Sequence, residues 1–215
     1  MHLFEQKMKK EILEQIKKLG RNIDNVKGNS LQEDLQSITF DTVLYQRPTD
    51  TPWATAEEEE PIYGIGDFIN QNESLFKEDK AAFYDKIIQK YFRVTTEGFG
   101  QVFWEASPFT PFKEETPDYA EWNGDFTDDE TDLTEIVKVT NDLSPDFVLL
   151  FTSYGFTDSY YIALSDPNPE NPTLFGTDHE VFFREVTNEG NLEDFLNTFM
   201  TKEELLEIVK RRIEK

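Results

Sequence analysis

The sequence predicts one α+β domain over residues 1–215, in which an antiparallel sheet carries N-terminal and C-terminal helices packed on it. Short runs with strand-like alternation, separated by clusters of Pro, Gly, Asn and Asp, fill the C-terminal third. Apolar residues at helical spacing occur at both ends. The chain has no Cys but contains 19 Phe, 8 Tyr and 3 Trp in 215 residues, so an aromatic-rich core can form without disulfides.

The first predicted element is an amphipathic helix within residues 1–20. Its apolar side chains recur at helical spacing: Phe4, Met8, Ile12, Ile16 and Leu19. Gly20 ends this stripe, and most of the opposite face is lysine. A basic helix of this kind suits a membrane surface or a partner protein, but the acidic body of the same chain is the nearer complement. We therefore expect the helix to pack on its own domain.

A strand and a loop are expected next. Residues 38–46 alternate in polarity as a half-buried strand does, and Pro48 stops that pattern. Residues 49–61 follow, with two prolines and four consecutive glutamates, a composition that suits an exposed connection better than a packed element. We expect this acidic segment to be a loop.

The middle of the chain is predicted to hold one helix and one short strand. Residues 77–92 have apolar side chains at helical spacing, and Asp79 is placed to cap the first turn. Residues 101–105 alternate like a strand. Residues 106–134 contain three prolines and many carboxylates, so extended loops are expected there.

The C-terminal third predicts an antiparallel meander followed by two helices. The strand candidates are residues 135–140, 147–152, 159–164 and 180–186. A helix is expected from Asn191, with Leu192, Phe195, Leu196 and Phe199 directed inward. Thr201 and Glu204 form a capping-box pattern for a last helix. That helix ends in basic residues, which the negative end of its dipole favours.

Charge excludes several classes of function. With 44 acidic and 21 basic residues, the formal net charge is -23, so nucleic acid and anionic membranes should repel the protein. We expect no direct nucleic-acid partner and no membrane partner. The first seven residues lack an apolar leader, and the longest apolar runs, such as residues 147–151, are too short to span a bilayer. The expected location is the cytoplasm.

Residues 114–135 form an acidic segment with ten carboxylates and no basic residue. Like charges at this density repel each other and do not assist folding, so the segment is either a solvated loop or a surface for a basic protein partner. Aromatic residues among the acids could anchor such a partner. The predicted partner-binding residues are Asp118, Glu121, Trp122, Asp125, Phe126, Asp128, Asp129, Glu130 and Asp132.

No cofactor, metal site or catalytic residue is predicted. The carboxylates after Asp125 are oxygen ligands of the type that Ca²⁺ takes, but the Gly and Glu of an EF-hand loop are missing from their positions. His2 lies at a terminus, and His179 lies in a turn without a nucleophile motif. The glycine pairs at 64–66 and 98–100 are fragments of a phosphate loop and indicate turns or bulges. An enzyme is not expected.

The meander resembles the C-terminal half of the SUKH superfamily over about a quarter of the chain. The residues that carry the resemblance are Phe147–Phe151, Gly155, Asp158–Leu164, Pro172–Phe175, Asp178–Glu180 and Leu192–Leu196. The resemblance implies a non-enzymatic α+β domain, often bacterial, and commonly an immunity protein that neutralises a toxin such as a nuclease. The acidic composition suits a protein that blocks a basic cleft.

The sequence leaves three hypotheses about function open. The first is an immunity-like or antitoxin-like inhibitor that binds a basic protein, such as a cognate toxin, through the acidic segment. The second is a hydrolase that uses paired carboxylates or His179, which requires a concave pocket with pKa-shifted groups. The third is a regulatory interaction scaffold.

Overall fold

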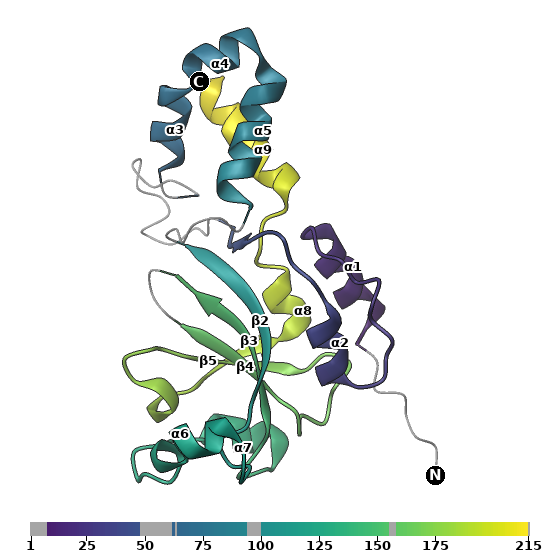
Figure 1. The fold of residues 1–215 in the computed structure, drawn as a ribbon, viewed down its shortest axis with the longest axis vertical. Coiled ribbons are helices and arrows are strands. Elements are labelled where there is room, and N and C mark those ends of the chain that lie inside the picture. The colour runs from purple at the N-terminus through teal and green to yellow at the C-terminus, as the bar shows by residue number, and fades with distance from the viewer. Residues whose placement is uncertain (1–7, 48–61, 63, 94–99, 155–157, 215) are drawn as a thin grey trace.

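A single antiparallel sheet organises the protein, and its strands lie side by side in chain order (Figure 1). The computed structural model describes residues 8–47, 62, 64–93, 100–154 and 158–214. Within these residues the strands are β1 Leu44–Tyr45, β2 Gln101–Phe109, β3 Phe147–Ser153, β4 Ser159–Ala163, β5 Thr173–Thr177 and β6 Thr187–Asn191. Each strand pairs with the next one in antiparallel register, so the antiparallel sheet and the α+β class are confirmed. Of the four strands predicted for the meander, β3 and β4 are found, while β5 and β6 lie where no strand was predicted.

The helices cover both sides and one end of this sheet. They are α1 Lys10–Lys18, α2 Leu31–Ser37, α3 Ile65–Gln71, α4 Glu73–Glu78, α5 Lys80–Tyr91, α6 Pro117–Phe126, α7 Thr134–Thr140, α8 Leu192–Leu196 and α9 Lys202–Ile213. A short 3-10 helix, η1, spans Phe182–Arg184. None of the helices in the described part of the chain is long and apolar enough to cross a membrane.

Three apolar cores show how these elements pack. The first, on one face of the sheet, joins Val148, Leu150 and Ile162 to buried residues of α1, α2 and α8. The second, on the opposite face, joins Phe147 and Tyr161 to α6, α7 and η1. Because side chains alternate along a strand, consecutive residues of β3 from 147 to 150 serve opposite cores. Leu150 and Phe151 both enter the first core, where the register between β3 and β4 shifts.

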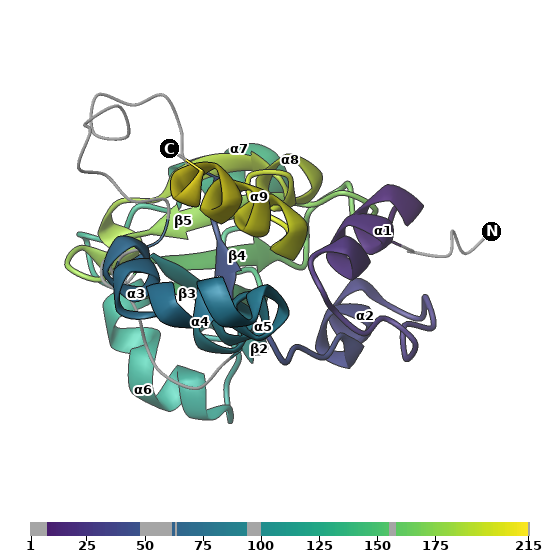
Figure 2. The same ribbon diagram turned by 90° about the horizontal axis from the view of Figure 1, so that it is seen from above.

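A third core lies within a helical lobe formed by α3, α4, α5 and α9, which stands beyond one end of the sheet (Figures 1 and 2). The lobe joins the sheet where β1 runs beside the segment before α9. There, the N–H of Met200 donates to the carbonyl of Tyr45, with 2.8 Å between N and O. The guanidinium of Arg47 also lies 3.0 Å from the carboxylate of Glu204.

The helices predicted to begin at Asp79, Asn191 and Thr201 are confirmed. Asp79 accepts a hydrogen bond from the N–H of Ala82 at 3.0 Å and begins α5. Asn191 accepts one from the N–H of Asp194 at 2.9 Å and begins α8. Thr201 and Glu204 form the reciprocal capping box of α9. Each cap satisfies helix N–H groups that have no partner within the helix.

Two predicted strands are wrong. Residues 135–140 belong to α7, because Leu133, Ile136 and Val139 meet the second core at a spacing of three, which a strand cannot provide. Residues 180–186 contain η1 instead. Phe182 and Phe183 are adjacent, yet both pack in the second core, whereas a strand would direct them to opposite faces.

Several other boundaries differ from the sequence prediction. The strand expected over residues 38–46 is reduced to β1 and isolated bridges, because Thr39 and Thr42 each pair at one point only. The glycine pair at 64–66, expected to be a turn or bulge, begins α3, and Gly64 adopts a φ of 76° before its first residue. The described residues do not include the predicted loop over residues 49–61, nor His2, nor Phe4. Of the glycine pair at 98–100, residues 98 and 99 also lie outside them.

Candidate functional site

The acidic segment, residues 114–135, contains α6 and the start of α7, and residues 106–109 belong to β2, so the loops predicted over residues 106–134 are found only at residues 110–116 and 127–133. Strand β2 continues to Phe109, and α6 begins after Thr116, whose hydroxyl accepts from the N–H of Tyr119 at 3.1 Å. Pro117 occupies the first helical position, where its missing N–H costs no helix hydrogen bond. The prolines that predicted an extended chain therefore mark a strand end and a helix start.

The aromatic and acidic residues of α6 lie on different faces. Asp118, Trp122 and Phe126 are four residues apart, so they share the face turned towards the sheet. Phe126 is buried in the second core, and Trp122 packs on Phe182 with ring centroids 5.2 Å apart. Phe126 is buried and serves the core, so it offers no exposed anchor to a partner. Trp122 is half-buried, and its role in partner binding stays a prediction.

Asp118 also has a structural role. Its carboxylate accepts hydrogen bonds from the backbone N–H of Thr110 at 2.8 Å and from the hydroxyl of the same residue at 3.2 Å. These contacts fix α6 against the end of β2. The remaining predicted partner-binding residues are exposed to solvent: Glu121, Asp125, Asp128, Asp129, Glu130 and Asp132.

A second group of carboxylates surrounds a cavity of about 350 Å³ beside β4, β5 and β6. We call it the acidic cavity. Tyr160 and Val181 contribute its apolar wall. Its carboxylates are Asp158, Asp178, Glu180, Glu185 and Glu189. The sequence alone does not reveal this cavity, because its walls come from three separate stretches of chain.

The ionisation of the acidic cavity reflects this crowding. Burial raises the pKa of Asp158, the charge of Asp178 raises it further, and His179 and Glu189 act in opposite directions on it. Burial, together with the charges of Asp158 and Glu189, raises the pKa of Tyr160 to about 12. Burial is the largest cause of both shifts, and the neighbouring carboxylates shift the pKa in the same direction.

The acidic segment and the acidic cavity adjoin each other. Glu130 lies 3.0 Å from the guanidinium of Arg184, at the end of η1. The N–H of Asp132 donates to the carbonyl of Phe183 at 2.9 Å. Because η1 lies between cavity residues 181 and 185, these contacts join the two groups into one surface, which we call the acidic end.

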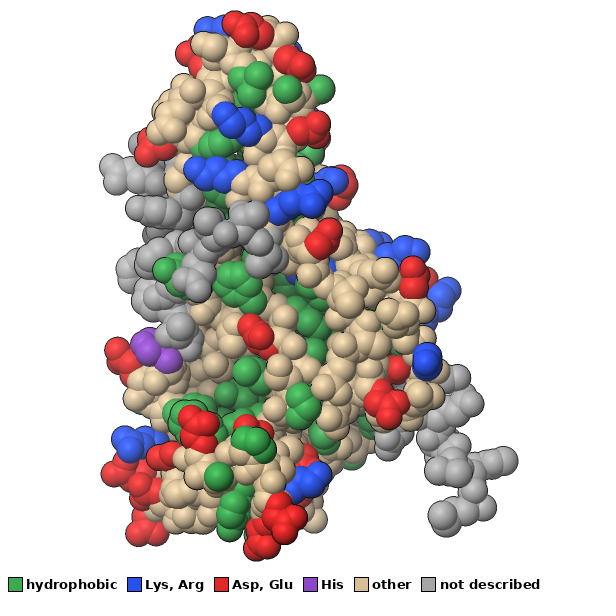
Figure 3. Space-filling view, viewed as in Figure 1, with side chains coloured by type: hydrophobic (Ala, Val, Ile, Leu, Met, Phe, Trp, Pro, Cys, Tyr) green, Lys and Arg blue, Asp and Glu red, His purple; other side chains and the backbone are tan. Residues whose placement is uncertain are grey.

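Most of the net charge of the chain lies in the stretch of sequence that contains the acidic end. Residues 100–200 hold 22 of the 44 acidic residues but only 3 of the 21 basic ones, so this stretch carries -19 of the net -23. Figure 3 shows mainly Asp and Glu side chains over the lower end of the molecule, where α6 and α7 lie, and side chains of both charges over the helical lobe.

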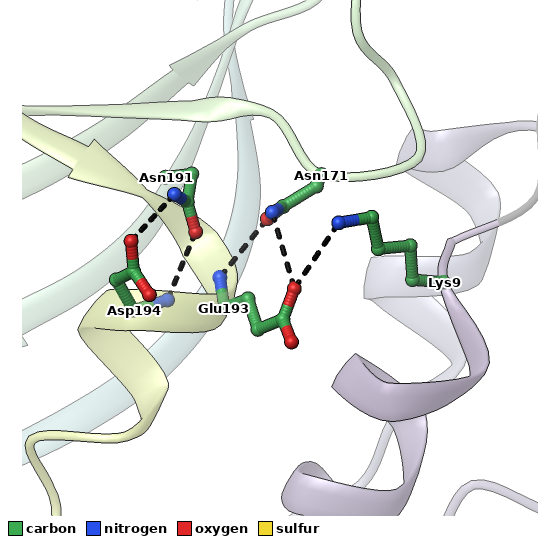
Figure 4. Close-up of polar contacts among 5 residues, drawn as sticks. All are labelled: Lys9, Asn171, Asn191, Glu193 and Asp194. Atoms are coloured by element: carbon green, nitrogen blue, oxygen red, sulfur yellow. Dashed lines mark hydrogen bonds and ion pairs between the residues drawn. The ribbon is translucent and has the colours of Figure 1, made fainter.

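Some carboxylates of this stretch serve the fold. Glu193 accepts hydrogen bonds from Asn171 at 3.3 Å and from Lys9 at 3.2 Å, which ties the start of α1 to α8 (Figure 4). Ile12 and Ile16 of α1 are fully buried in the first core. The prediction that the N-terminal helix packs on its own domain is therefore confirmed for α1.

The described residues offer little for metal or histidine chemistry. They contain no group of three or more His, Asp or Glu side chains arranged to hold a metal ion. Asp128 and Asp132 instead accept hydrogen bonds from backbone N–H groups two residues further on. His179 is about half exposed, and its Nδ1 lies 3.3 Å from the carboxylate of Asp178 at the edge of the cavity.

Comparisons with protein-family models, with curated proteins and with solved structures found no match to this chain.

Proposed function

We propose that this protein is an acidic binding protein that inhibits a basic protein partner, as an immunity protein or antitoxin inhibits a toxin such as a nuclease. The observation that carries the proposal is the concentration of unpaired carboxylates at the acidic end. Carboxylates gathered at this density oppose folding, so a binding role accounts for them better than a structural one does.

The acidic end has two parts that suit such a partner. The exposed carboxylates of the acidic segment create a broad negative field, which accelerates the encounter with a positively charged protein. The acidic cavity adds a concave surface in which carboxylates stand beside the apolar wall of Tyr160 and Val181. A protein that grips nucleic-acid phosphates must present basic side chains, and these complement both parts.

The resemblance of the meander to the SUKH superfamily supports the same function. It is carried by β3, β4, the segment at β5 and the start of α8, which surround or support the acidic cavity. In this proposal the aromatic residues Trp122 and Phe126 do not anchor the partner, in contrast to the sequence prediction. They hold α6 on the sheet, and the carboxylates outside them face the partner.

The test compares two variants with the same change of charge. In the end variant, four carboxylates that accept no described hydrogen bond become amides: Glu121→Gln, Asp125→Asn, Asp129→Asn and Glu180→Gln. In the lobe variant, four carboxylates of the helical lobe become amides: Asp67→Asn, Glu78→Gln, Asp85→Asn and Glu214→Gln. Both variants are co-expressed with the basic protein that the wild-type chain captures from its native host.

The expected result is that the wild-type chain and the lobe variant neutralise this partner, and that the end variant does so poorly. Association of the end variant should be slower by about tenfold at low salt, because steering depends on the charges it lacks. Association of the wild type should weaken as salt is added. Full protection by the end variant, or association that does not respond to salt, would contradict the proposal.

A hydrolase is the second candidate, and the acidic cavity is the observation that favours it. A carboxyl whose pKa is raised by burial can donate a proton while a neighbouring ionised carboxylate acts as base or nucleophile. Asp158 would be the acid in that scheme. Turnover of chromogenic glycosides or esters that Asp158→Asn abolishes would favour this function. Absence of turnover by the wild-type protein would reject it.

A further inference from the structure

Three neighbouring strands give the acidic cavity its shape. In the register of the sheet, Gly176 of β5 lies between Tyr160 of β4 and Thr187 of β6. Cross-strand partners share one face of a sheet, so the side chains of Tyr160 and Thr187 flank a position that carries no side chain. The cavity therefore has its floor at Gly176 and an aromatic wall beside it.

Space, and not backbone conformation, requires a glycine at this floor. Gly176 does not have the positive φ that favours glycine. A Cβ atom at this position would lie 2.8 Å from a carboxylate oxygen of Glu189 and 3.0 Å from the hydroxyl oxygen of Thr187. The side chain of Glu189 thus lies across β5 because Gly176 leaves room for it. A glycine inside a strand is typical of a site where another group approaches the backbone closely.

Carboxylates from different strands converge on the ring of Tyr160. Burial raises the pKa of Asp158, and the charges of Asp178 and Glu189 raise it further, so these three groups are close enough to interact. The charges of Asp158 and Glu189 also act on the hydroxyl of Tyr160. No Lys or Arg is among the described residues that line the cavity, so this negative charge is not balanced there.

The cavity is open to a ligand from solvent. Asp158 and Tyr160 are partly exposed, and the outer carboxylates are exposed: Asp178, Glu180, Glu185 and Glu189. The ring of Tyr160 is fixed from behind by Phe195, with ring centroids 4.9 Å apart. The volume of about 350 Å³ is that of a small ligand pocket.

An aromatic wall among carboxylates suits a guanidinium better than an ammonium group. A guanidinium is planar, so its face can stack on an aromatic ring while the N–H groups at its edge donate to carboxylates. An ammonium group is a compact charge that is more strongly hydrated, and it has no flat face to place on the ring. The chemistry of the cavity therefore favours arginine over lysine.

We propose that the acidic cavity receives an arginine side chain of the basic partner, whose guanidinium stacks on the ring of Tyr160 and donates to Asp158 and Glu189. This inference rests on the proposed function and adds the chemical group that the partner must present. It also gives the two parts of the acidic end different roles. The exposed carboxylates of the acidic segment accelerate the encounter, and the cavity holds the partner after it has docked.

The experiment titrates the isotope-labelled full chain with N-acetylarginine amide and follows the backbone amide signals by NMR. N-acetyllysine amide, at the same concentrations and ionic strength, is the matched probe. In the wild type, the arginine probe should shift the signals of Gly176 and Thr187 in a saturable way. The lysine probe should bind about threefold more weakly or worse, because it lacks the planar fork.

Gly176→Ala changes the shape of the cavity and leaves its charge unchanged. The added methyl group displaces the carboxylate of Glu189, so the affinity for the arginine probe should fall by about threefold or more. Glu189→Gln keeps the test decisive if that variant fails to fold, and it should weaken binding by a similar factor. Glu78→Gln in the helical lobe makes the same change of charge and should leave the affinity as it is in the wild type.

Three results would overturn the inference and leave the proposed function standing. They are signal shifts confined to the acidic segment, equal affinities for the two probes, and wild-type affinity in Glu189→Gln or in a folded Gly176→Ala variant. A failure of the proposed function looks different. In that case the arginine probe still binds at the cavity, but the end variant neutralises the captured protein as well as the lobe variant does.

Discussion

Asp158 is the carboxylate of the acidic cavity whose ionisation opposes folding. Its pKa is raised by burial and then by the charge of Asp178. A carboxyl with a higher pKa in the folded protein contributes stability below its unfolded pKa, about 3.9 for aspartate, and this contribution is lost as the pH rises through the folded value. Ionisation of Asp158 therefore costs folding free energy.

The raised pKa of Asp158 predicts how the substitution Asp158→Asn changes stability. The amide removes a repelled charge, and the carboxylate accepts no hydrogen bond from the described residues, so the free energy of unfolding at pH 7 should rise. The difference from wild type should shrink as the pH falls below about 4, where the unfolded aspartate is protonated too. Urea unfolding at pH 7 and pH 3 measures both values.

Asp118→Ala is the contrasting control at the residue scale. Its carboxylate accepts two hydrogen bonds from Thr110, so its removal should destabilise the protein at pH 7 by about 1 to 3 kcal/mol. If Asp158→Asn destabilised the protein at pH 7 as well, the like charges around the cavity would not govern the ionisation of Asp158.

At the scale of elements, local chemistry decides which parts of the fold the sequence predicts. The starts of α5, α8 and α9 are marked by Asp79, Asn191 and Thr201, whose side chains bond to the backbone within three residues. Signals of this range are visible in the sequence alone. The strands β3 and β4 were predicted for a similar reason, because turn residues bound each of them.

The errors arise where tertiary packing overrides a local pattern. Residues 135–140 are rich in β-branched side chains, which favour a strand, but the second core receives Leu133, Ile136 and Val139 at a spacing of three. The segment of η1 is bent because Phe182 and Phe183 both enter that core, and Phe182 adopts a φ of 47°. Neither outcome is contained in the hydrophobic pattern of the segment itself.

The sequence predicts only part of the candidate site, because the rest depends on tertiary packing. The acidic segment is visible as a run of charges, and its exposed carboxylates lie where a partner can reach them. The inward face of α6 follows only once that segment is a helix, with Asp118, Trp122 and Phe126 four residues apart. The acidic cavity required the pairing of β4, β5 and β6, which places Asp158 near Glu189 across the sheet.

At the scale of the whole molecule, charge and hydrophobic packing are distributed differently. Apolar cores lie on both faces of the sheet and inside the helical lobe, so burial is spread over the structure. Net charge is not spread evenly along the chain, because residues 100–200 carry -19 of the total -23. Self-repulsion of this kind lowers stability, so the proposed binding surface exists at the expense of folding free energy.

Salt should therefore stabilise the protein, and the acidic end should account for most of the effect. The Debye length falls from about 30 Å at 0.01 M to about 10 Å at 0.1 M ionic strength, which screens repulsion across the acidic end. Urea unfolding of the wild type at these two ionic strengths should show a rise of about 1 kcal/mol, the size of a few exposed charge pairs. At 0.01 M the end variant should already be more stable than wild type, and it should respond less to salt. The lobe variant, with the same net charge, should keep the wild-type response, so equal responses of the two variants would assign the repulsion to total charge and not to the acidic end.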